Sequence, residues 1–104
     1  MKNPREYGSP PYSIAVIHGG PGACGEMKPV AENLSKDLGI LEPLQTSSSL
    51  QGQVDELKKI LSRSGTSPFI LVGFSWGAWL SLLTTAYYPS LIKKIILIGS
   101  GPFK

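Results

Sequence analysis

Short apolar runs alternate with amphipathic stretches along the chain. Each run is short enough for a buried strand and is rich in branched aliphatic residues. We expect strands at 13–18, 39–44, 68–72 and 94–99. The second run contains Pro43, which cannot donate a ladder hydrogen bond and therefore favours the edge of a sheet.

Between these runs, apolar residues recur at helical spacing. A first helix is expected near 26–37, and a third from 78 to 88, where Pro89 ends it. The second helix follows the polar residues 46–49. Its expected apolar face consists of Leu50, Val54, Leu57, Ile60 and Leu61.

Strands that alternate with helices predict a parallel sheet covered on both faces, which is a three-layer α/β/α domain with four parallel strands. We expect residues 1–12 to be an extended N-terminal segment and residues 13–104 to form the domain. At 104 residues the chain is one domain, whose core is just large enough to fold.

The most informative motif is Gly73-Phe74-Ser75-Trp76-Gly77. It follows an expected strand and precedes an expected helix, which is the context of a nucleophile elbow. A serine on such a tight turn needs small residues two positions away on either side. The pattern predicts that Ser75 is a strained, exposed nucleophile.

A second motif, His18-Gly19-Gly20-Pro21-Gly22, directly follows the first expected strand. A serine that attacks a carbonyl creates an oxyanion, which needs two N–H donors aimed at it. One is the backbone amide after the nucleophile, that of Trp76, and we expect the other to be that of Gly20. Pro21 has no N–H, so it can stiffen the loop but cannot donate.

The two motifs, in this order and about fifty residues apart, resemble the α/β-hydrolase superfamily, and most closely its proline iminopeptidase-like branch. The resemblance extends from about Tyr12 to Phe103. It implies the strand order 2-1-3-4, numbered along the chain. It also implies that His18 supports the oxyanion loop and is not the catalytic base, and that the substrate is a small ester or amide or a short peptide.

The sequence departs from that family in one respect. Family members carry an acid and then a histidine after the serine, whereas this sequence has no Asp, Glu or His after Ser75. We therefore expect the N-terminal half of a hydrolase, nearly inactive alone. Its 94–99 strand would be an exposed edge, covered by a second copy or a companion chain.

Composition narrows the remaining classes. The formal net charge is +3 and the lysines are scattered, unlike a nucleic-acid-binding patch. One cysteine, Cys24, cannot form an internal disulfide. No signal core or membrane-length run is visible. We expect a cytoplasmic hydrolase that needs no metal or cofactor and binds neither nucleic acid nor membranes.

Two other interpretations stay open. Residues 20–25 also match the Gly-x-Gly-x-x-Gly pattern of dinucleotide-binding proteins, with Glu42 about twenty residues on. That fold would order the strands 3-2-1-4 and would leave Ser75 without a role. Alternatively, because the acid and histidine are missing, the chain is a non-catalytic scaffold built on a hydrolase fold.

Overall fold

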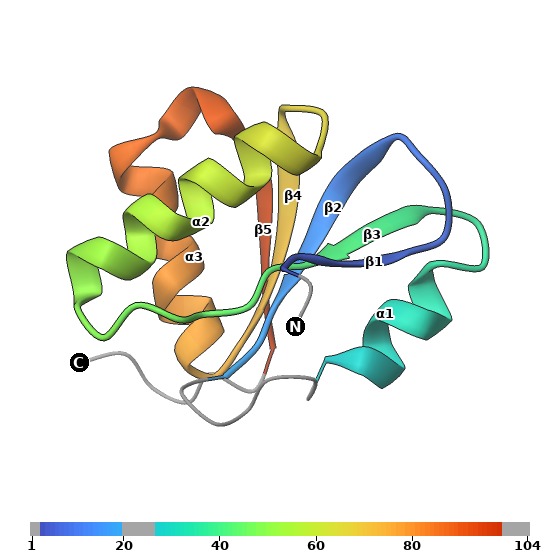
Figure 1. Ribbon diagram of the computed structural model, residues 1–104, viewed down its shortest axis with the longest axis horizontal. Coiled ribbons are helices and arrows are strands. Elements are labelled where there is room, and N and C mark those ends of the chain that lie inside the picture. Colours follow the sequence, from blue (N-terminus) through green and yellow to red (C-terminus); the bar gives the residue numbers. More distant parts are fainter. Residues whose placement is uncertain (1–2, 20–26, 99–104) are drawn as a thin grey trace.

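A mixed five-stranded sheet forms the centre of the molecule, with strand order β1-β3-β2-β4-β5 (Figure 1). The structure is a computed structural model that describes residues 3–19 and 27–98. In the described part, the strands are β1 (Arg5–Tyr7), β2 (Tyr12–Ile17), β3 (Gly39–Glu42), β4 (Phe69–Phe74) and β5 (Ile92–Ile98). The helices are α1 (Lys28–Leu34), α2 (Leu50–Ser64) and α3 (Trp76–Tyr87), and the 3-10 turn η1 (Pro89–Leu91) follows α3.

The predicted four-stranded parallel sheet is wrong in its strand number. The four expected strands correspond to β2, β3, β4 and β5. They lie side by side and parallel in the order β3-β2-β4-β5. The predicted order 2-1-3-4 describes these four strands but omits β1. That strand lies inside the expected N-terminal segment and pairs antiparallel with β3. Because β1 covers β3, the prediction that Pro43 marks a sheet edge is also wrong, and Pro43 follows the last residue of β3.

The same topology excludes the dinucleotide-binding interpretation. The expected strands 1, 2, 3 and 4 are β2, β3, β4 and β5 in the structure. The dinucleotide-binding order 3-2-1-4 would therefore place β4 beside β3. Instead β4 pairs with β2, in a register that joins Ile14 to Ile70 and Ile17 to Gly73. The carboxyl ends of β2 and β4, each of which leads into a glycine motif, are therefore neighbours.

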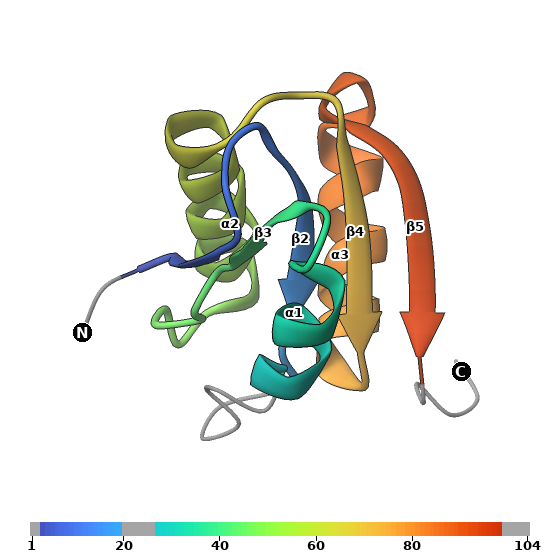
Figure 2. The ribbon, with the colours of Figure 1, turned by 90° about the vertical axis from the view of Figure 1, so that its right-hand side faces the viewer.

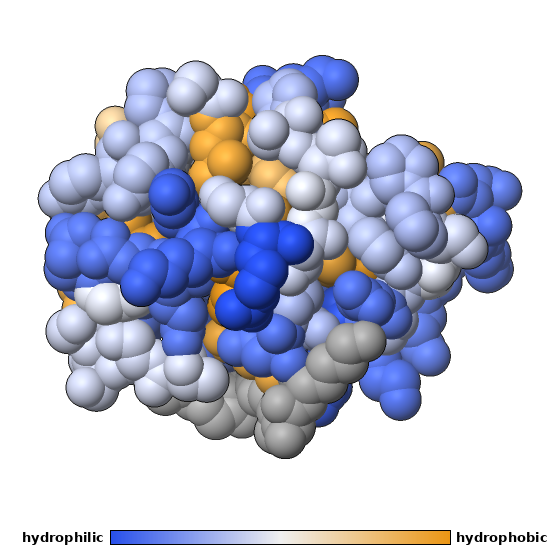
Figure 3. Space-filling model, turned by 45° about the horizontal axis from the view of Figure 1, so that its top comes forward, coloured by the Kyte–Doolittle hydropathy of each residue, from blue (hydrophilic) through white to orange (hydrophobic). Residues whose placement is uncertain are grey.

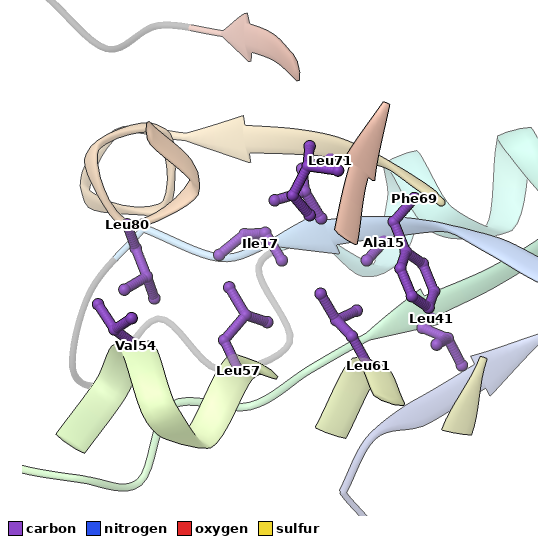
Figure 4. Close-up of a cluster of buried hydrophobic side chains, with 10 residues drawn as sticks. Ala15, Ile17, Leu41, Val54, Leu57, Leu61, Phe69, Leu71 and Leu80 are labelled. Atoms are coloured by element: carbon purple, nitrogen blue, oxygen red, sulfur yellow. The ribbon is translucent and has the colours of Figure 1, made fainter. Parts of the chain in front are cut away.

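Helices cover both faces of the sheet, with α2 and α3 on one side and α1 on the other (Figure 2). The larger core cluster lies beneath α2 and α3 (Figure 4). It contains Ala15, Ile17, Leu41, Val54, Leu57, Leu61, Phe69, Leu71, Leu80 and Ile92. The smaller cluster lies beneath α1 and contains Val16, Met27, Ala31, Ile40 and Val72.

Helix α1 differs from the prediction in its length, and helix α2 differs in its buried face. Helix α1 spans only Lys28–Leu34, shorter than the expected range of 26–37. Helix α2 has the predicted buried face from Val54 to Leu61, but Leu50 is 50% exposed. Leu50 is the first residue of the helix, and the buried face begins at Gln53.

Among the described strands, β5 forms an edge of the sheet, as predicted (Figure 2). Its last three residues are partly exposed, with Ile96 at 40%, Leu97 at 39% and Ile98 at 38%. On the face drawn in Figure 3, by contrast, hydrophobic surface is divided into patches by hydrophilic residues. Within residues 3–19 and 27–98, no helix has the length and apolar character needed to cross a membrane.

Candidate active site

Ser75 occupies a sharp turn between the last residue of β4 and the first residue of α3. Its φ of 56° and ψ of −118° make it the one non-glycine residue with positive φ in the described part of the chain. Such a conformation costs on the order of 1–3 kcal/mol and persists only where the surrounding structure imposes it. Ser75 is exposed, whereas Gly73 and Gly77 on either side are buried.

The two flanking glycines are sterically required. A Cβ atom at Gly73 would lie 2.6 Å from the carbonyl oxygen of Gly77 and 2.7 Å from Cα of Ala78. A Cβ atom at Gly77 would collide with the carbonyl oxygen of Ile17 and lie 2.7 Å from that of His18. The spacing of the motif therefore follows from how closely α3 approaches the ends of β4 and β2.

Backbone hydrogen bonds hold the turn. The N–H of Ser75 donates to the carbonyl oxygen of Ile98 at 3.3 Å, and the N–H of Ala78 donates to the carbonyl oxygen of Ser75 at 3.0 Å. Trp76 is the first residue of α3, so its own N–H has no partner within the helix. Amides in this position favour a developing negative charge.

His18 lies at the buried end of β2 and is 1% exposed. Its Nε2 accepts a hydrogen bond from the backbone N–H of Gln45 at 3.0 Å, and its carbonyl oxygen accepts one from Gln45 Nε2 at 2.8 Å. A ring nitrogen that accepts from a backbone amide carries no proton and is occupied. This arrangement suits a structural role for His18 at the start of the glycine loop.

The structure thus brings part of the predicted site together. Gly77, two residues after Ser75, packs directly against the backbone of Ile17 and His18 at the end of β2. Gly19 is buried next to His18. The predicted oxyanion donor Gly20, with Pro21 and Gly22, lies outside the described residues, as does Cys24.

Sequence reasoning missed two glutamines beside this site. Gln53, 7% exposed, accepts a hydrogen bond from the indole Nε1–H of Trp76 at 2.8 Å and donates to the carbonyl oxygen of Ser47 at 3.1 Å. Gln45 makes the two bonds to His18 described above. The available signal was a polar residue at position 53, directly before Val54 on the apolar side of α2.

Two tyrosines in other parts of the fold have raised pKa values. Burial, followed by the neighbouring Glu42 carboxyl, raises the pKa of Tyr7 on β1. Burial and then Asp55 raise the pKa of Tyr88, at the opposite end of α3 from Ser75. Among residues 3–19 and 27–98, no three His, Cys, Asp or Glu side chains gather as metal ligands would.

Comparison with known proteins agrees with the fold. A family model described as the alpha/beta hydrolase fold matches residues 21–104. The chain belongs to the α/β-hydrolase fold family. Its members include hydrolases such as esterases and epoxide hydrolases, and the solved structures similar to this chain include a marine microorganism esterase and a Bacillus megaterium epoxide hydrolase.

Individual relatives match only part of their own length. Epoxide hydrolase 4 of Mus musculus is 35% identical over 55 residues, which are 53% of this chain and 15% of that protein. An epoxide hydrolase from Vigna radiata has a TM-score of 0.80 at 20% identity, over 95% of this chain and 36% of its own. An α/β-hydrolase enzyme from the metagenome of Mar Chica lagoon sediments, Morocco, has a TM-score of 0.74 at 23% identity, over 90% of this chain and 46% of its own.

Proposed function

We propose that Ser75 is the nucleophile of a serine hydrolase that transfers an acyl group to water. The observation that carries this proposal is the conformation of Ser75, an exposed serine with a φ of 56° between two glycines that admit no side chain. Strain of this kind persists at functional sites. If this turn had only a structural role, glycine at position 75 would make it more stable than serine does, because glycine adopts positive φ without strain.

The chemistry follows from the position of the hydroxyl. Ser75 Oγ attacks the carbonyl carbon of an ester or amide, its proton passes to a base, and the carbonyl oxygen becomes an oxyanion. The N–H of Trp76, at the start of α3, and that of Gly20 would stabilise this charge. Collapse of the intermediate expels the alcohol or amine, and water then hydrolyses the acyl-enzyme.

In this proposal the base comes from outside residues 1–104. His18 is the only histidine in the sequence, and its Nε2 is occupied by Gln45. No acid or histidine follows Ser75. We propose that a polypeptide beyond these residues supplies both and docks beside β5, whose edge presents Ile96, Leu97 and Ile98 for strand addition.

The substrate class is proposed from the glycine motif and the elbow together. The sequence His18-Gly19-Gly20-Pro21-Gly22 and the Trp76 that follows the serine support a proline iminopeptidase-like enzyme. Its substrates would be short peptides or small esters. A serine hydroxyl suits this acyl transfer, because it forms an ester intermediate that water can cleave.

An external base tests the nucleophile without the missing polypeptide. Residues 1–104 are incubated with a fluorophosphonate, with and without imidazole, and the adduct is located and timed by peptide mass spectrometry. The matched control is Ser62→Ala, at an exposed serine on α2. Removing the base of a triad costs on the order of 10⁶ in turnover, so labelling without imidazole should be slow.

The proposal predicts that imidazole accelerates labelling at Ser75 more than at any other serine. It also predicts that Ser75→Ala abolishes this signal and that Ser62→Ala leaves it unchanged. Equal acceleration at Ser62 and Ser75 would show ordinary serine reactivity and would support the non-catalytic scaffold. Rapid stoichiometric labelling of Ser75 without imidazole would show that residues 1–104 already contain a base.

A further inference from the structure

We propose that Gln45 and Gln53 are positioning residues that hold Trp76, whose backbone amide is one donor of the proposed oxyanion hole, in a fixed position relative to His18 at the end of β2. The Gln45–Gln53 bracket, defined as Gln45, Ser47 and Gln53, connects the end of β2 to the residue after the nucleophile. The inference rests on the proposed function, because that function gives the Trp76 amide its role.

The first arm of the bracket fixes the end of β2. Gln45 donates two hydrogen bonds to His18. Its backbone N–H donates to Nε2 of His18 at 3.0 Å, and its side-chain amide donates to the carbonyl oxygen of His18 at 2.8 Å. Two bonds from one residue define the orientation of the His18 ring and of its peptide group. His18 and the buried Gly19 lead directly into the predicted oxyanion loop.

The second arm fixes the residue after Ser75. Gln53 accepts from the indole of Trp76 at 2.8 Å and donates to the carbonyl oxygen of Ser47 at 3.1 Å. Gln53 is 7% exposed on the buried side of α2. Leaving either end of this buried amide unpaired would cost free energy, so both hydrogen bonds are favoured. Together they connect Trp76 to the segment that contains Gln45, which binds His18.

A third set of bonds makes the segment rigid. The carboxylate of Glu56, on α2, accepts from the backbone N–H of Thr46 at 2.9 Å, from the N–H of Ser47 at 3.4 Å and from the hydroxyl of Thr46. Ser49 caps the same helix through a bond from the N–H of Gly52 at 3.0 Å. The segment between β3 and α2 is therefore held by the helix as well as by the site.

The consequence concerns catalytic geometry. Oxyanion donors act only when they are aimed correctly in advance, and a misplacement of about 1 Å can cost about 10² in rate. One proposed donor, the Trp76 amide, begins α3, and His18 directly follows β2. The bracket is a hydrogen-bonded path between these segments that does not pass through Ser75.

The test uses ¹H–¹⁵N NMR of the 104-residue chain, with hydrogen exchange of the Trp76 indole N–H as the first measurement. Gln53→Met removes the acceptor at nearly constant volume. The control is Gln51→Met, on the same helix, where the exposed glutamine bonds only Asp55 among described residues. We expect Gln53→Met to speed exchange of the Trp76 indole by about two- to tenfold and to shift the backbone amides of Trp76 and Ser47.

Gln53→Glu separates the two bonds. It keeps an oxygen that can accept from Trp76 and removes the donor to Ser47. The indole should stay protected while the Ser47 amide shifts. If Gln53→Met does not fold, Trp76→Phe replaces it, and the side-chain amide protons of Gln53 should then exchange faster.

A functional measurement separates positioning from plain stability. In the imidazole assay, Gln53→Met should slow labelling of Ser75 by about 10- to 10²-fold, and Gln53→Glu should recover much of that loss. The inference is overturned if Gln53→Met moves the Trp76 amide no more than Gln51→Met does. It is also overturned if Ser75 is labelled at equal rates in the Gln53→Met and Gln51→Met variants. If NMR supports the bracket but Ser75 never reacts, the proposed function fails instead.

Discussion

A Cβ atom at Gly77 would collide with the carbonyl oxygen of Ile17, the last residue of β2. This contact links the two glycine motifs, since Ile17 precedes His18 and Gly77 follows Ser75 by two residues. The spacing of the elbow motif is therefore a packing requirement between α3 and β2. It places the start of α3 against the end of β2.

We predict that Gly77→Ala destabilises the chain. At an ordinary helical position alanine is about 0.5–1 kcal/mol more stable than glycine, so the expected sign is reversed here. The clash with backbone atoms should lower the free energy of unfolding by about 1–3 kcal/mol. Urea denaturation measures this change.

The control for that variant is Ala86→Gly, at an exposed position near the end of α3. It should lose about 0.5–1 kcal/mol through helix propensity alone. A Gly77→Ala variant as stable as the wild type would mean that α3 does not approach β2 as described.

The strand β1 gives a second prediction, which concerns alkaline pH. The hydroxyl of Tyr7 donates to Oε1 of the fully buried Glu42 at 2.8 Å. Tyr7→Phe should cost about 1–3 kcal/mol, because it leaves the carboxyl of Glu42 without this donor. Tyr12→Phe is the control, since among the described residues the hydroxyl of Tyr12 makes only an exposed bond of 3.5 Å, to the carbonyl oxygen of Gly8.

The pKa of Tyr7 is raised above its ordinary value of 10.0, first by burial and then by Glu42. The stability that this shift contributes is fully present below the unfolded pKa and is lost as the pH rises through the folded pKa. The stability difference between wild type and Tyr7→Phe should therefore be constant below about pH 10 and shrink above it. Urea unfolding from pH 8 upward measures it, and a difference that grows with pH would contradict the contact.

The edge strand gives a third prediction, about assembly. An open parallel edge with exposed apolar residues is a template for pairing. We expect residues 1–104 to self-associate through β5, and Leu97→Lys to shift light-scattering mass toward the monomer. Tyr87→Lys is the control, because Tyr87 is 59% exposed on α3 rather than on the sheet edge. A wild-type chain that stays a monomer at high concentration would contradict this account.

The parts of the fold that could be predicted from sequence are those with strong hydrophobic patterns. The apolar runs indicated β2, β3, β4 and β5, and the period of α2 indicated its buried face from Val54 to Leu61. The strand β1 was missed because it is three residues long and reads Arg-Glu-Tyr. Its pairing depends on contacts with β3 that no local pattern reveals.

The candidate site likewise contains residues that the sequence reveals and residues that it does not. Ser75 and its glycines are visible in sequence because backbone strain restricts which residues can stand there. Gln45 and Gln53 were not visible, because their roles depend on hydrogen bonds to residues 27 and 23 positions away. A local pattern carries steric rules within one turn, whereas the hydrogen bonds around the site depend on tertiary contacts.

The central claim is that Ser75 and two backbone amides form one acyl-transfer site. The most direct test is a crystal structure of the chain after fluorophosphonate treatment with imidazole. We predict an adduct on Ser75 whose phosphoryl oxygen lies about 2.7–3.1 Å from the backbone nitrogens of Trp76 and Gly20. An adduct on another residue, or a phosphoryl oxygen turned away from both amides, would contradict the account.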